Sequence, residues 1–498
     1  MNVSRICFAS RIHSSLSIFM RVLIVGGGIA GLSAAYDLQK AVLARRPCCA
    51  SAASAAREVL ELSLLEASGR LGGKLLGDTL GGVPVDAGPD SFLSTRPAAV
   101  ELLTELGLRK KILTTERTRR DVFVYSRGRL RKYPDGLMML MPAKVLPFLA
   151  SDLLSLPEKL RMGLEAFVPP LKEEKDESLA EFGRRRFGEA AVRTILEPVF
   201  AGIYAGDVEA LSLNSTFPQF RELEQRYGSI LRGVYARKGP AAKPSGGLTM
   251  FVTLEGGVAS FPEALAERVR PCARLNARVK TLRREGGRWR AELASEETLE
   301  ADVVVLAAPA DASAALLEHE APAVASLLRR FEFSSTAAVN LLYETSALRR
   351  RPEGFGFLVQ RREEVSLTAA TFTSNKFPGR APEGKTLIRC YFGGKGREAP
   401  LDMDDEGLAR AAAGDLERIL GLGARPLGAS VHRWPKANAL YNVGHAARLA
   451  GLEAALPAFP GLLLCGGCYR GIGIPECVRS GREAARRALQ GVPPGAVV

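Results

Sequence analysis

Uninterrupted apolar runs, each followed by a helical pattern or a turn, occur near both ends of the chain. Residues 21–25 (RVLIV) and 58–67 (EVLELSLLEA) predict two buried strands, and apolar residues at helical spacing follow the first of them. Residues 301–312 (ADVVVLAAPADA) and 461–465 (GLLLC) repeat the strand pattern much later in the sequence. Strands that alternate with helices indicate an α/β domain. Because its pieces are far apart in the sequence, this domain is assembled from discontinuous segments.

The middle of the chain has two other patterns. Between 112 and 220, apolar stripes alternate with proline breaks, which predicts a helical domain. Residues 333–344 and 385–394 predict buried strands and 404–420 a helix, which together indicate an α+β domain. We therefore expect an α/β domain of residues 21–111, 271–312 and 431–498, a helical domain of 112–220, and an α+β domain of 221–270 and 313–430. Residues 1–19 are an extension or the product of a misassigned start.

The first strand breaks into Gly26-x-Gly28-x-x-Gly31 and continues as a helix, which is the context that a dinucleotide-binding turn requires. Gly26 permits the tight turn, Gly28 lets the backbone approach a pyrophosphate, and Gly31 lets the helix pack on the strand. The amides at the start of the helix then face the phosphates. The predicted cofactor contacts in this turn are Gly26, Gly27, Gly28, Ile29, Ala30, Gly31 and Leu32.

The second strand ends at Glu66, whose carboxylate can accept hydrogen bonds from both hydroxyls of a ribose. A solvated carboxylate at a strand end is the alternative. Glu66 lies farther from the glycine turn than is usual, because residues 45–58 (RRPCCASAASAARE) intervene. This low-complexity segment is typical of a surface insertion between helix and strand.

Three further segments extend the predicted nucleotide site. Arg70-x-Gly72-Gly73 follows Glu66 and distinguishes FAD proteins from NAD dehydrogenases, whose family pattern has no such extension. The two glycines let the chain pass close to the diphosphate and flavin, and Arg70 supplies charge. The Gly-Pro loop of residues 86–92 is expected to place amides near the isoalloxazine. The last helix would direct its positive N-terminal end at the flavin, with a plain packing helix as the alternative. These segments add the predicted contacts Glu66, Ala67, Arg70, Gly73, Lys74, Gly88, Pro89, Asp90, Ser91, Ile472, Gly473 and Ile474.

The composition excludes several classes of protein. The 498 residues are 47% apolar and 24% charged, which rules out a disordered tail and a small disulfide-stapled scaffold. Eight cysteines are too few and too unevenly spaced for a secreted disulfide framework. Cys465 and Cys468 form a CxxC pair without the second ligand pair of a structural zinc site, so we expect no metal. No apolar stretch has the length of a membrane span.

Charge is concentrated in one segment. The formal net charge is +14, and residues 109–132 contain ten Lys and Arg residues against Glu116 and Asp121. Such a segment fits anionic lipid, an anionic small substrate or a plain solvated face; no nucleic-acid motif accompanies it, so we expect no nucleic-acid partner. Residues 1–19 are Ser-rich and basic, which is the composition of a transit peptide.

The nucleotide motifs together resemble those of the FAD-dependent amine oxidase and phytoene desaturase superfamily. Within it, the stretches EPVFAGIYAGDVEALS, GFGFLV, NKFPGRAPEG and CYRGIGIPECVRSG resemble the oxygen-dependent protoporphyrinogen oxidases. The resemblance runs over nearly the whole chain from Arg21. It implies a Rossmann-like FAD-binding domain that holds FAD non-covalently, with Val279 near the adenine and Trp434 near the flavin ring.

The resemblance also implies an enzyme that oxidises protoporphyrinogen IX to protoporphyrin IX in haem biosynthesis, by hydride transfer to flavin and with release of hydrogen peroxide from molecular oxygen. The flavin rather than a side chain is expected to carry the chemistry, and only four histidines are present. Gly202, Leu358 and Phe377 would contact the tetrapyrrole, although the latter two could be core residues. Val122 stands where the family often has a propionate-binding Arg, so Arg120 is expected to substitute. This departure keeps coproporphyrinogen III as the alternative substrate.

For the helical domain, the resemblance implies docking on anionic lipid at the inner face of the cell membrane, with the protein otherwise cytoplasmic and a homodimer allowed. A helical core packed on the flavin domain is the alternative. Rival functions on the same motifs are a carotenoid desaturase, an amine oxidase, or a non-catalytic binding protein similar to the GDP-dissociation inhibitors. Cys468 in the string GGCY also suggests covalent attachment of the flavin, because monoamine oxidases use a similar string. In those enzymes the string precedes the terminal flavin motif, whereas here it lies inside that motif.

Overall fold

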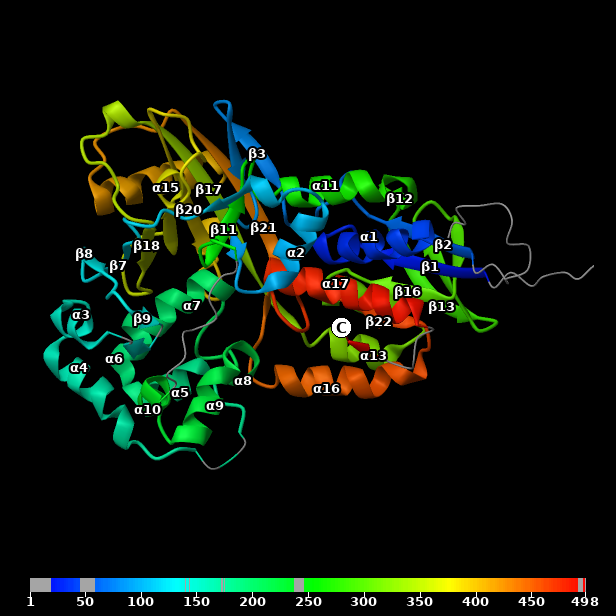
Figure 1. Ribbon diagram of the computed structural model, residues 1–498, viewed down its shortest axis with the longest axis horizontal. Coiled ribbons are helices and arrows are strands. Elements are labelled where there is room, and N and C mark those ends of the chain that lie inside the picture. The colour runs from blue at the N-terminus through cyan, green and yellow to red at the C-terminus, as the bar shows by residue number, and fades with distance from the viewer. Residues whose placement is uncertain are drawn as a thin grey trace, which may run out of the picture.

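The structure is a computed structural model that describes residues 19–44, 59–138, 140–142, 144–171, 173, 175–236, 246–490 and 496–497. The predicted insertion at 45–58 and all but the last residue of the extension at 1–19 lie outside the described residues. Two sheets and a group of helices organise the fold (Figure 1).

A six-stranded sheet forms the centre of the first unit, and all of its strand pairs are parallel. In spatial order its strands are β12 (Ala273–Arg274), β2 (Val59–Leu65), β1 (Phe19–Val25), β16 (Val303–Leu306), β22 (Leu462–Leu464) and β23 (Ala496–Val497). The central strands are apolar on both faces because other elements cover each face. The sheet thus joins the apolar runs from the two ends of the chain.

Helices cover one face of this sheet, and a small sheet with further helices covers the other. The first face carries α1 (Ile29–Ala44), α2 (Pro97–Glu105), α11 (Ser260–Val269) and α17 (Ile474–Leu489). The second carries β13 (Val279–Glu285), β14 (Arg288–Leu293), β15 (Thr298–Ala301), α12 (Ala310–Leu317), α13 (Pro322–Leu328) and α16 (His445–Ala455). The first and last long helices, α1 and α17, lie side by side (Figure 1). Gly481 allows their close approach, because a Cβ there would lie 2.0 Å from the carbonyl oxygen of Ala30.

A seven-stranded mixed sheet forms the second unit. In spatial order its strands are β21 (Gly428–Leu440), β17 (Glu332–Glu344), β20 (Lys385–Gly393), β19 (Ala369–Phe372), β18 (Gly356–Val359), β7 (Val122–Ser126) and β8 (Arg129–Lys132). Only β18 and β7 pair in parallel. Helix α15 (Asp405–Leu420) covers one face with Leu408, Ala412 and Leu416; it begins where Asp404 caps the Gly407 amide at 2.7 Å. The other face of the sheet is turned toward the first unit.

The third unit is a group of short helices at one end of the molecule (Figure 1). Its helices are α3 (Val145–Ala150), α4 (Leu156–Gly163), α5 (Leu179–Phe187), α6 (Glu189–Ala191), α7 (Glu197–Tyr204), α8 (Leu213–Thr216), α9 (Pro218–Tyr227) and α10 (Ile230–Ala236), with a π-helical segment at Val192–Leu196. Phe182, Phe200 and Phe220 pack in its core. Arg186 and Glu165 form an ion pair in this core, and both side chains are 0% exposed.

Small elements connect the units. These are β3 (Gly77–Leu80) with β4 (Val83–Asp86), β5 (Phe92–Leu93) and β6 (Ile112–Thr114) with β11 (Phe251–Leu254), β9 (Leu137–Met138) with β10 (Met141–Pro142), α14 (Thr373–Lys376), and the single turns Arg109–Lys111, Leu164–Phe167, Arg270–Cys272, Thr345–Ala347, Ala399–Asp402 and Leu456–Ala458.

The sheets do not follow the domain limits expected from the sequence. β7 and β8 lie in the range predicted to be helical, yet they extend the seven-stranded sheet. β21 belongs to the same sheet and runs to Leu440, inside the range predicted for the α/β domain. β7 is placed by its pairing with β18, in which Val124 lies opposite Leu358, and β21 is placed by its pairing with β17. Both partners are far away in the sequence. Hydrophobic periodicity does not reveal such partners.

Candidate active site

The glycine turn between β1 and α1 has the shape that a dinucleotide phosphate requires. Gly26 has a φ of +113°, and a Cβ there would lie 2.9 Å from the carbonyl oxygen of Ala307. At Gly31 a Cβ would lie 1.9 Å from the carbonyl oxygen of Gly26, whereas at Gly28 it would meet nothing within 4 Å. Two glycines are therefore needed for packing, and the third leaves open space beside the first turn of α1. That open face, next to Ile29, Ala30 and Leu32, suits an anionic phosphate.

Glu66 is held at the same turn. One of its carboxylate oxygens accepts a hydrogen bond from the Gly27 amide at 2.7 Å, and the other accepts from the amide and hydroxyl of Ser68 at 2.8 Å and 2.7 Å. A carboxylate has about four lone-pair sites, so acceptor capacity remains for ribose hydroxyls. Ala277, two residues before Val279, donates its amide to the Glu66 carbonyl at 2.9 Å. The structure thus holds the segment that leads into Val279 against Glu66, and the predicted contact of Val279 with the adenine stays a prediction.

The loop after Glu66 and Ala67 packs against the glycine turn. The Gly72 amide donates to the Gly27 carbonyl at 2.9 Å, and a Cβ at Gly73 would lie 3.0 Å from the Cα of Gly28. Arg70 donates to the carbonyl oxygen of Gly73 at 2.7 Å and, more weakly, to that of Leu71. We expected Arg70 to supply charge to the ligand, but at least part of its guanidinium fastens this loop.

Residues 86–91 form a second loop, and the seven-stranded sheet holds it from several strands. Arg389 on β20 donates to the carbonyl oxygens of Asp86 and Gly88, and the Trp434 indole on β21 donates to that of Ala87 at 2.8 Å. Lys74 donates to the Ala437 carbonyl and so connects the first loop to β21. A Cβ at Gly88 would lie 1.8 Å from the Lys74 carbonyl oxygen, so only glycine fits. Both predicted flavin loops are therefore fixed against the sheet, with Pro89 exposed.

Asp90 carries a negative charge inside this loop. Burial would raise the pKa of Asp90, but Lys376, Arg389 and the hydroxyls of Ser91 and Tyr391 outweigh it and lower that pKa to about 2. Lys376 lies 3.8 Å from the Asp90 carboxylate and donates to the Ser91 hydroxyl at 3.2 Å. Asp90 is therefore ionised and paired across the boundary between the two sheets.

The rings of Tyr441 and His445 hold the turn before α17 in place through hydrogen bonds. The Tyr441 hydroxyl donates to the Gly467 carbonyl at 2.9 Å and accepts from the Gly471 amide at 2.7 Å. His445 stacks on Tyr441 with ring centroids 4.0 Å apart and donates from Nε2 to the Tyr469 carbonyl at 2.8 Å. Burial lowers the pKa of His445 to about 4, so the ring is neutral. The turn and the predicted contacts Ile472, Gly473 and Ile474 thus have a rigid support.

A candidate ligand wall lies where α7 meets β18. A Cβ at Gly202 would lie 3.2 Å from Cδ2 of Leu358, so these two predicted residues are neighbours, and Gly202 is exposed. Strand register places Leu358 opposite Ala369, and Ala369 opposite Tyr391. The Tyr391 hydroxyl donates to Asp90 at 3.2 Å. Sequence reasoning missed Tyr391, although a tyrosine within an otherwise apolar strand is a signal that could have marked it.

Phe377 does not share this wall. Its side chain is 0% exposed, and Lys376 lies over its ring with Nζ 5.0 Å from the ring centroid. A residue without exposed surface packs the protein interior, so the structure favours the core alternative for Phe377. Arg120 is exposed and precedes β7, where Val122 pairs with Gly356. Within the described part of the chain Arg120 has no hydrogen bond or ion pair, and its predicted contact with substrate stays a prediction.

The cysteines near the last turn remain thiols. Burial raises the pKa of Cys465, Cys468 and Cys477, which keeps these groups protonated. Among the described residues no three His, Cys, Asp or Glu side chains are placed to hold a metal ion. No helix in the described part of the chain is both long and apolar enough to cross a membrane.

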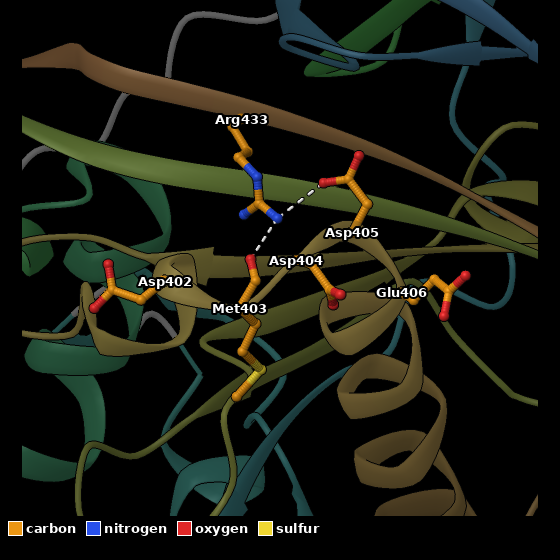
Figure 2. A pocket seen from close by; sticks show the side chains of 6 residues that line it. All are labelled: Asp402, Met403, Asp404, Asp405, Glu406 and Arg433. Carbon is orange, nitrogen blue, oxygen red and sulfur yellow. Dashed lines mark hydrogen bonds and ion pairs between the residues drawn. The ribbon is translucent and has the colours of Figure 1, made fainter.

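A separate recess lies at the start of α15. It has a volume of about 580 Å³ and is lined by Arg433 and by the acidic residues at the start of α15, Asp402, Asp404, Asp405 and Glu406, together with Met403 (Figure 2). Arg433 pairs with Asp405 at 2.8 Å. Because side chains alternate along β21, Arg433 points to the α15 side of the sheet and Trp434 to the opposite side. This recess is therefore separate from the candidate site.

The chain is similar to known proteins over most of its length. The pattern of the family described as flavin containing amine oxidoreductase matches residues 29–489. Coproporphyrinogen III oxidase from Bacillus subtilis is 35% identical over 94% of this chain and 97% of its own length. Protoporphyrinogen oxidase 1 from the chloroplast of Spinacia oleracea is 30% identical over 94% of this chain and 84% of its own. A crystal structure from Exiguobacterium sp. 255-15, provisionally assigned as a protoporphyrinogen oxidase, superposes with a TM-score of 0.81 at 31% identity and covers 95% of this chain and 99% of its own.

Proposed function

Because this chain belongs to the flavin containing amine oxidoreductase family and its cofactor is FAD, we propose that it oxidises a porphyrinogen to a porphyrin in haem biosynthesis. The similarity to the Bacillus subtilis coproporphyrinogen III oxidase over nearly the full length of both chains carries this proposal. From the sequence we expected protoporphyrinogen IX as the substrate, with coproporphyrinogen III as the alternative. We now favour coproporphyrinogen III, because that relative is more similar than the spinach protoporphyrinogen oxidase.

The residues fit FAD at each part of the expected site. Gly28 offers open backbone to a phosphate, Glu66 retains free acceptor positions, and the two loops at 69–74 and 86–91 are fixed between the sheets. Bound FAD supplies a two-electron acceptor that molecular oxygen can reoxidise with release of hydrogen peroxide. We propose that attachment is non-covalent, because the buried Cys468 thiol has a raised pKa and is therefore a weak nucleophile.

The chain's own part in the reaction is placement. Leu358, Gly202 and Tyr391 would hold one side of the puckered, flexible porphyrinogen macrocycle, while the positive N-terminal end of α17 favours negative charge in front of that helix. His445 is neutral and engaged in the support of a turn, so it is not placed to act as a base. A pyrrole N–H proton would leave to water or to a backbone carbonyl. We therefore propose that no side chain of this chain is the catalytic base.

The decisive assay supplies purified, FAD-loaded protein with coproporphyrinogen III and with protoporphyrinogen IX in air, and follows porphyrin fluorescence and hydrogen peroxide. We expect faster turnover of coproporphyrinogen III and no turnover without oxygen. An absorption band near 450 nm without oxidation of either porphyrinogen would reject the proposal and favour another flavin oxidase. Protein without that band would favour a non-catalytic binding protein.

We also propose that the helical unit docks on the inner face of the cell membrane. Large apolar side chains are exposed on α3, α4 and the turn after them, with Leu146 80%, Leu156 66%, Leu160 63% and Phe167 76% exposed. Monomeric proteins rarely expose so many apolar side chains in one region, and such an arrangement suits an interface.

Flotation with vesicles tests this docking. The protein should float with vesicles that contain anionic phosphatidylglycerol, and the variant Leu146→Glu with Phe167→Glu should stay at the bottom of the gradient. Leu427→Glu is the matched control, because Leu427 is 58% exposed but lies just before β21 on the sheet unit. Equal flotation of the double variant and the control would refute membrane docking through these helices.

A further inference from the structure

Arg389 spans three consecutive carbonyl oxygens of the loop of residues 86–91. From β20 its guanidinium donates to the carbonyl oxygens of Asp86 and Gly88, and more weakly to that of Ala87 at 3.4 Å. The residue is 3% exposed, and its Nε has no hydrogen-bond partner among the residues that the structure describes. A planar guanidinium reaches several acceptors at once, which an ammonium group with its single nitrogen does not. Arg389 thus fixes the backbone of the loop that is expected to meet the flavin.

Arg389 also brings a positive charge to this loop. The two acids of the loop are each paired with another cation. Asp86 pairs with Arg380 at 2.7 Å, and Asp90 lies 3.8 Å from Lys376. Arg389 forms no ion pair of its own in the described part of the chain, although its charge acts to lower the pKa of both acids. Three cations therefore stand against two carboxylates, which leaves a net charge of +1 behind the loop.

These five charged groups are enclosed. The pair of Asp86 and Arg380 is nearly fully buried, and the pair of Asp90 and Lys376 is mostly buried. The ring of Tyr391 lies 5.2 Å from the Arg389 guanidinium and covers it from the side of the candidate ligand wall. Water screens enclosed charges poorly, so their field extends across the width of the loop.

We propose that Arg389 is a positioning residue for FAD, which holds the loop of residues 86–91 against the isoalloxazine and raises the reduction potential of the flavin through its charge. This inference rests on the proposed placement of FAD. Reduced flavin carries negative charge on its pyrimidine ring, and a fixed positive charge nearby favours that state over the neutral oxidised one. A higher potential makes the cofactor a stronger acceptor for the electrons of a porphyrinogen.

The test measures the potential of the flavin and its retention separately, and neither measurement needs a porphyrinogen. FAD-loaded protein is reduced together with a reference dye, and the midpoint potential is read from the absorption of both. Release of FAD is followed by flavin fluorescence after dilution of the loaded protein. Arg389→Met should lower the equilibrium constant for two-electron reduction about tenfold, which corresponds to about 30 mV. This is the effect of a unit charge at about 10 Å with an effective dielectric constant of about 20. FAD should also dissociate faster.

Two variants separate the charge of Arg389 from its hydrogen bonds. Arg389→Lys keeps the charge but does not bridge the carbonyl oxygens, so it should retain the wild-type potential and release FAD faster. Asn340→Ala removes an uncharged donor that lies 3.1 Å from the Asp86 carbonyl oxygen, and it should have the same two effects. Arg410→Met is the control, because it removes a charge on α15 that is 72% exposed and paired with Glu406; neither measurement should change.

Lys376→Met provides a second measurement of the charge if Arg389→Met fails to fold. Lys376 belongs to the same enclosed group, and its hydrogen bond goes to the Ser91 hydroxyl at 3.2 Å. Removal of this cation should lower the potential in the same direction as Arg389→Met.

The outcomes bear on Arg389 and on the substrate separately. A wild-type potential in folded Arg389→Met, or an equal decrease in Arg389→Met and Arg389→Lys, would overturn the role of the charge. Equal rates of FAD release in wild type, Arg389→Lys and Asn340→Ala would overturn the positioning role. The expected shifts in an enzyme that oxidises neither porphyrinogen would support Arg389 while refuting the proposed substrate. Porphyrinogen oxidation without these shifts would do the reverse.

Discussion

Replacement of Arg186 by methionine should destabilise the helical unit severely, because Arg186 lies in its interior. The guanidinium donates to the Glu165 carboxylate from Nε at 2.8 Å, and also to the carbonyl oxygens of Val168 at 2.8 Å and Gly228 at 3.1 Å. Both members of the ion pair are 0% exposed. Methionine fills similar space but removes every one of these donors.

The expected cost follows from what is left behind. Glu165 still accepts from the Ser229 hydroxyl at 2.6 Å and from the Ile230 amide at 2.9 Å, yet its charge becomes uncompensated in the interior. Removal of one partner from a buried ion pair costs about 3 to 5 kcal/mol of unfolding free energy. Arg410→Met, which removes an exposed charge from a different unit, should cost less than about 0.5 kcal/mol.

Amide hydrogen exchange provides the assay, because it reports each unit of a large protein separately. Exchange in α5 and α9 should accelerate in Arg186→Met, while exchange in β1 and α1 should stay at the wild-type rate. If the protection of α5 in this variant matches that in Arg410→Met, the assignment of the buried pair as a stabilising element is refuted.

Three further predictions concern the cofactor site. Burial lowers the pKa of His445 to about 4, below the unfolded value of about 6.5. The stability that comes from the neutral ring is therefore complete above about pH 6.5 and is lost as the pH drops toward 4, by about 3 kcal/mol in total. Urea unfolding at pH 7 and pH 4.5 should show a smaller loss of unfolding free energy in His445→Phe than in wild type. Gly28→Val should fold, because a Cβ at Gly28 meets only open space, but it should lose FAD, because the side chain fills the space expected for the phosphate. Gly31→Ala should lower the melting temperature, because its Cβ would lie 1.9 Å from a carbonyl oxygen. Equal melting temperatures of the two variants would contradict this difference. Acid precipitation should release all flavin into the supernatant, and yellow colour in the pellet would implicate Cys468.

The parts of the site that are predictable from the sequence are those built by neighbouring residues. The glycine turn, Glu66 and the start of α17 each depend on a short segment whose spacing states the backbone geometry directly. The position of Tyr391 depends instead on the register of strands that are far apart in the sequence. The same register places β7 and β8 in the seven-stranded sheet, and no periodicity within residues 112–132 indicates that partner.

Phe377 shows why a distinctive stretch need not contact a ligand. The residues around it, NKFPGRAP, supply Lys376 to Asp90 and Arg380 to Asp86, with Arg380 and the Asp86 carboxylate 2.7 Å apart and both nearly fully buried. Burial raises the pKa of Asp86 to about 6, although the positive charge of Arg380 acts in the opposite direction. The stretch therefore fixes the loop of residues 86–91 from the side of the sheet, and Phe377 packs beneath its charged neighbour. Its unusual composition is therefore explained by two buried ion pairs at the boundary between the units.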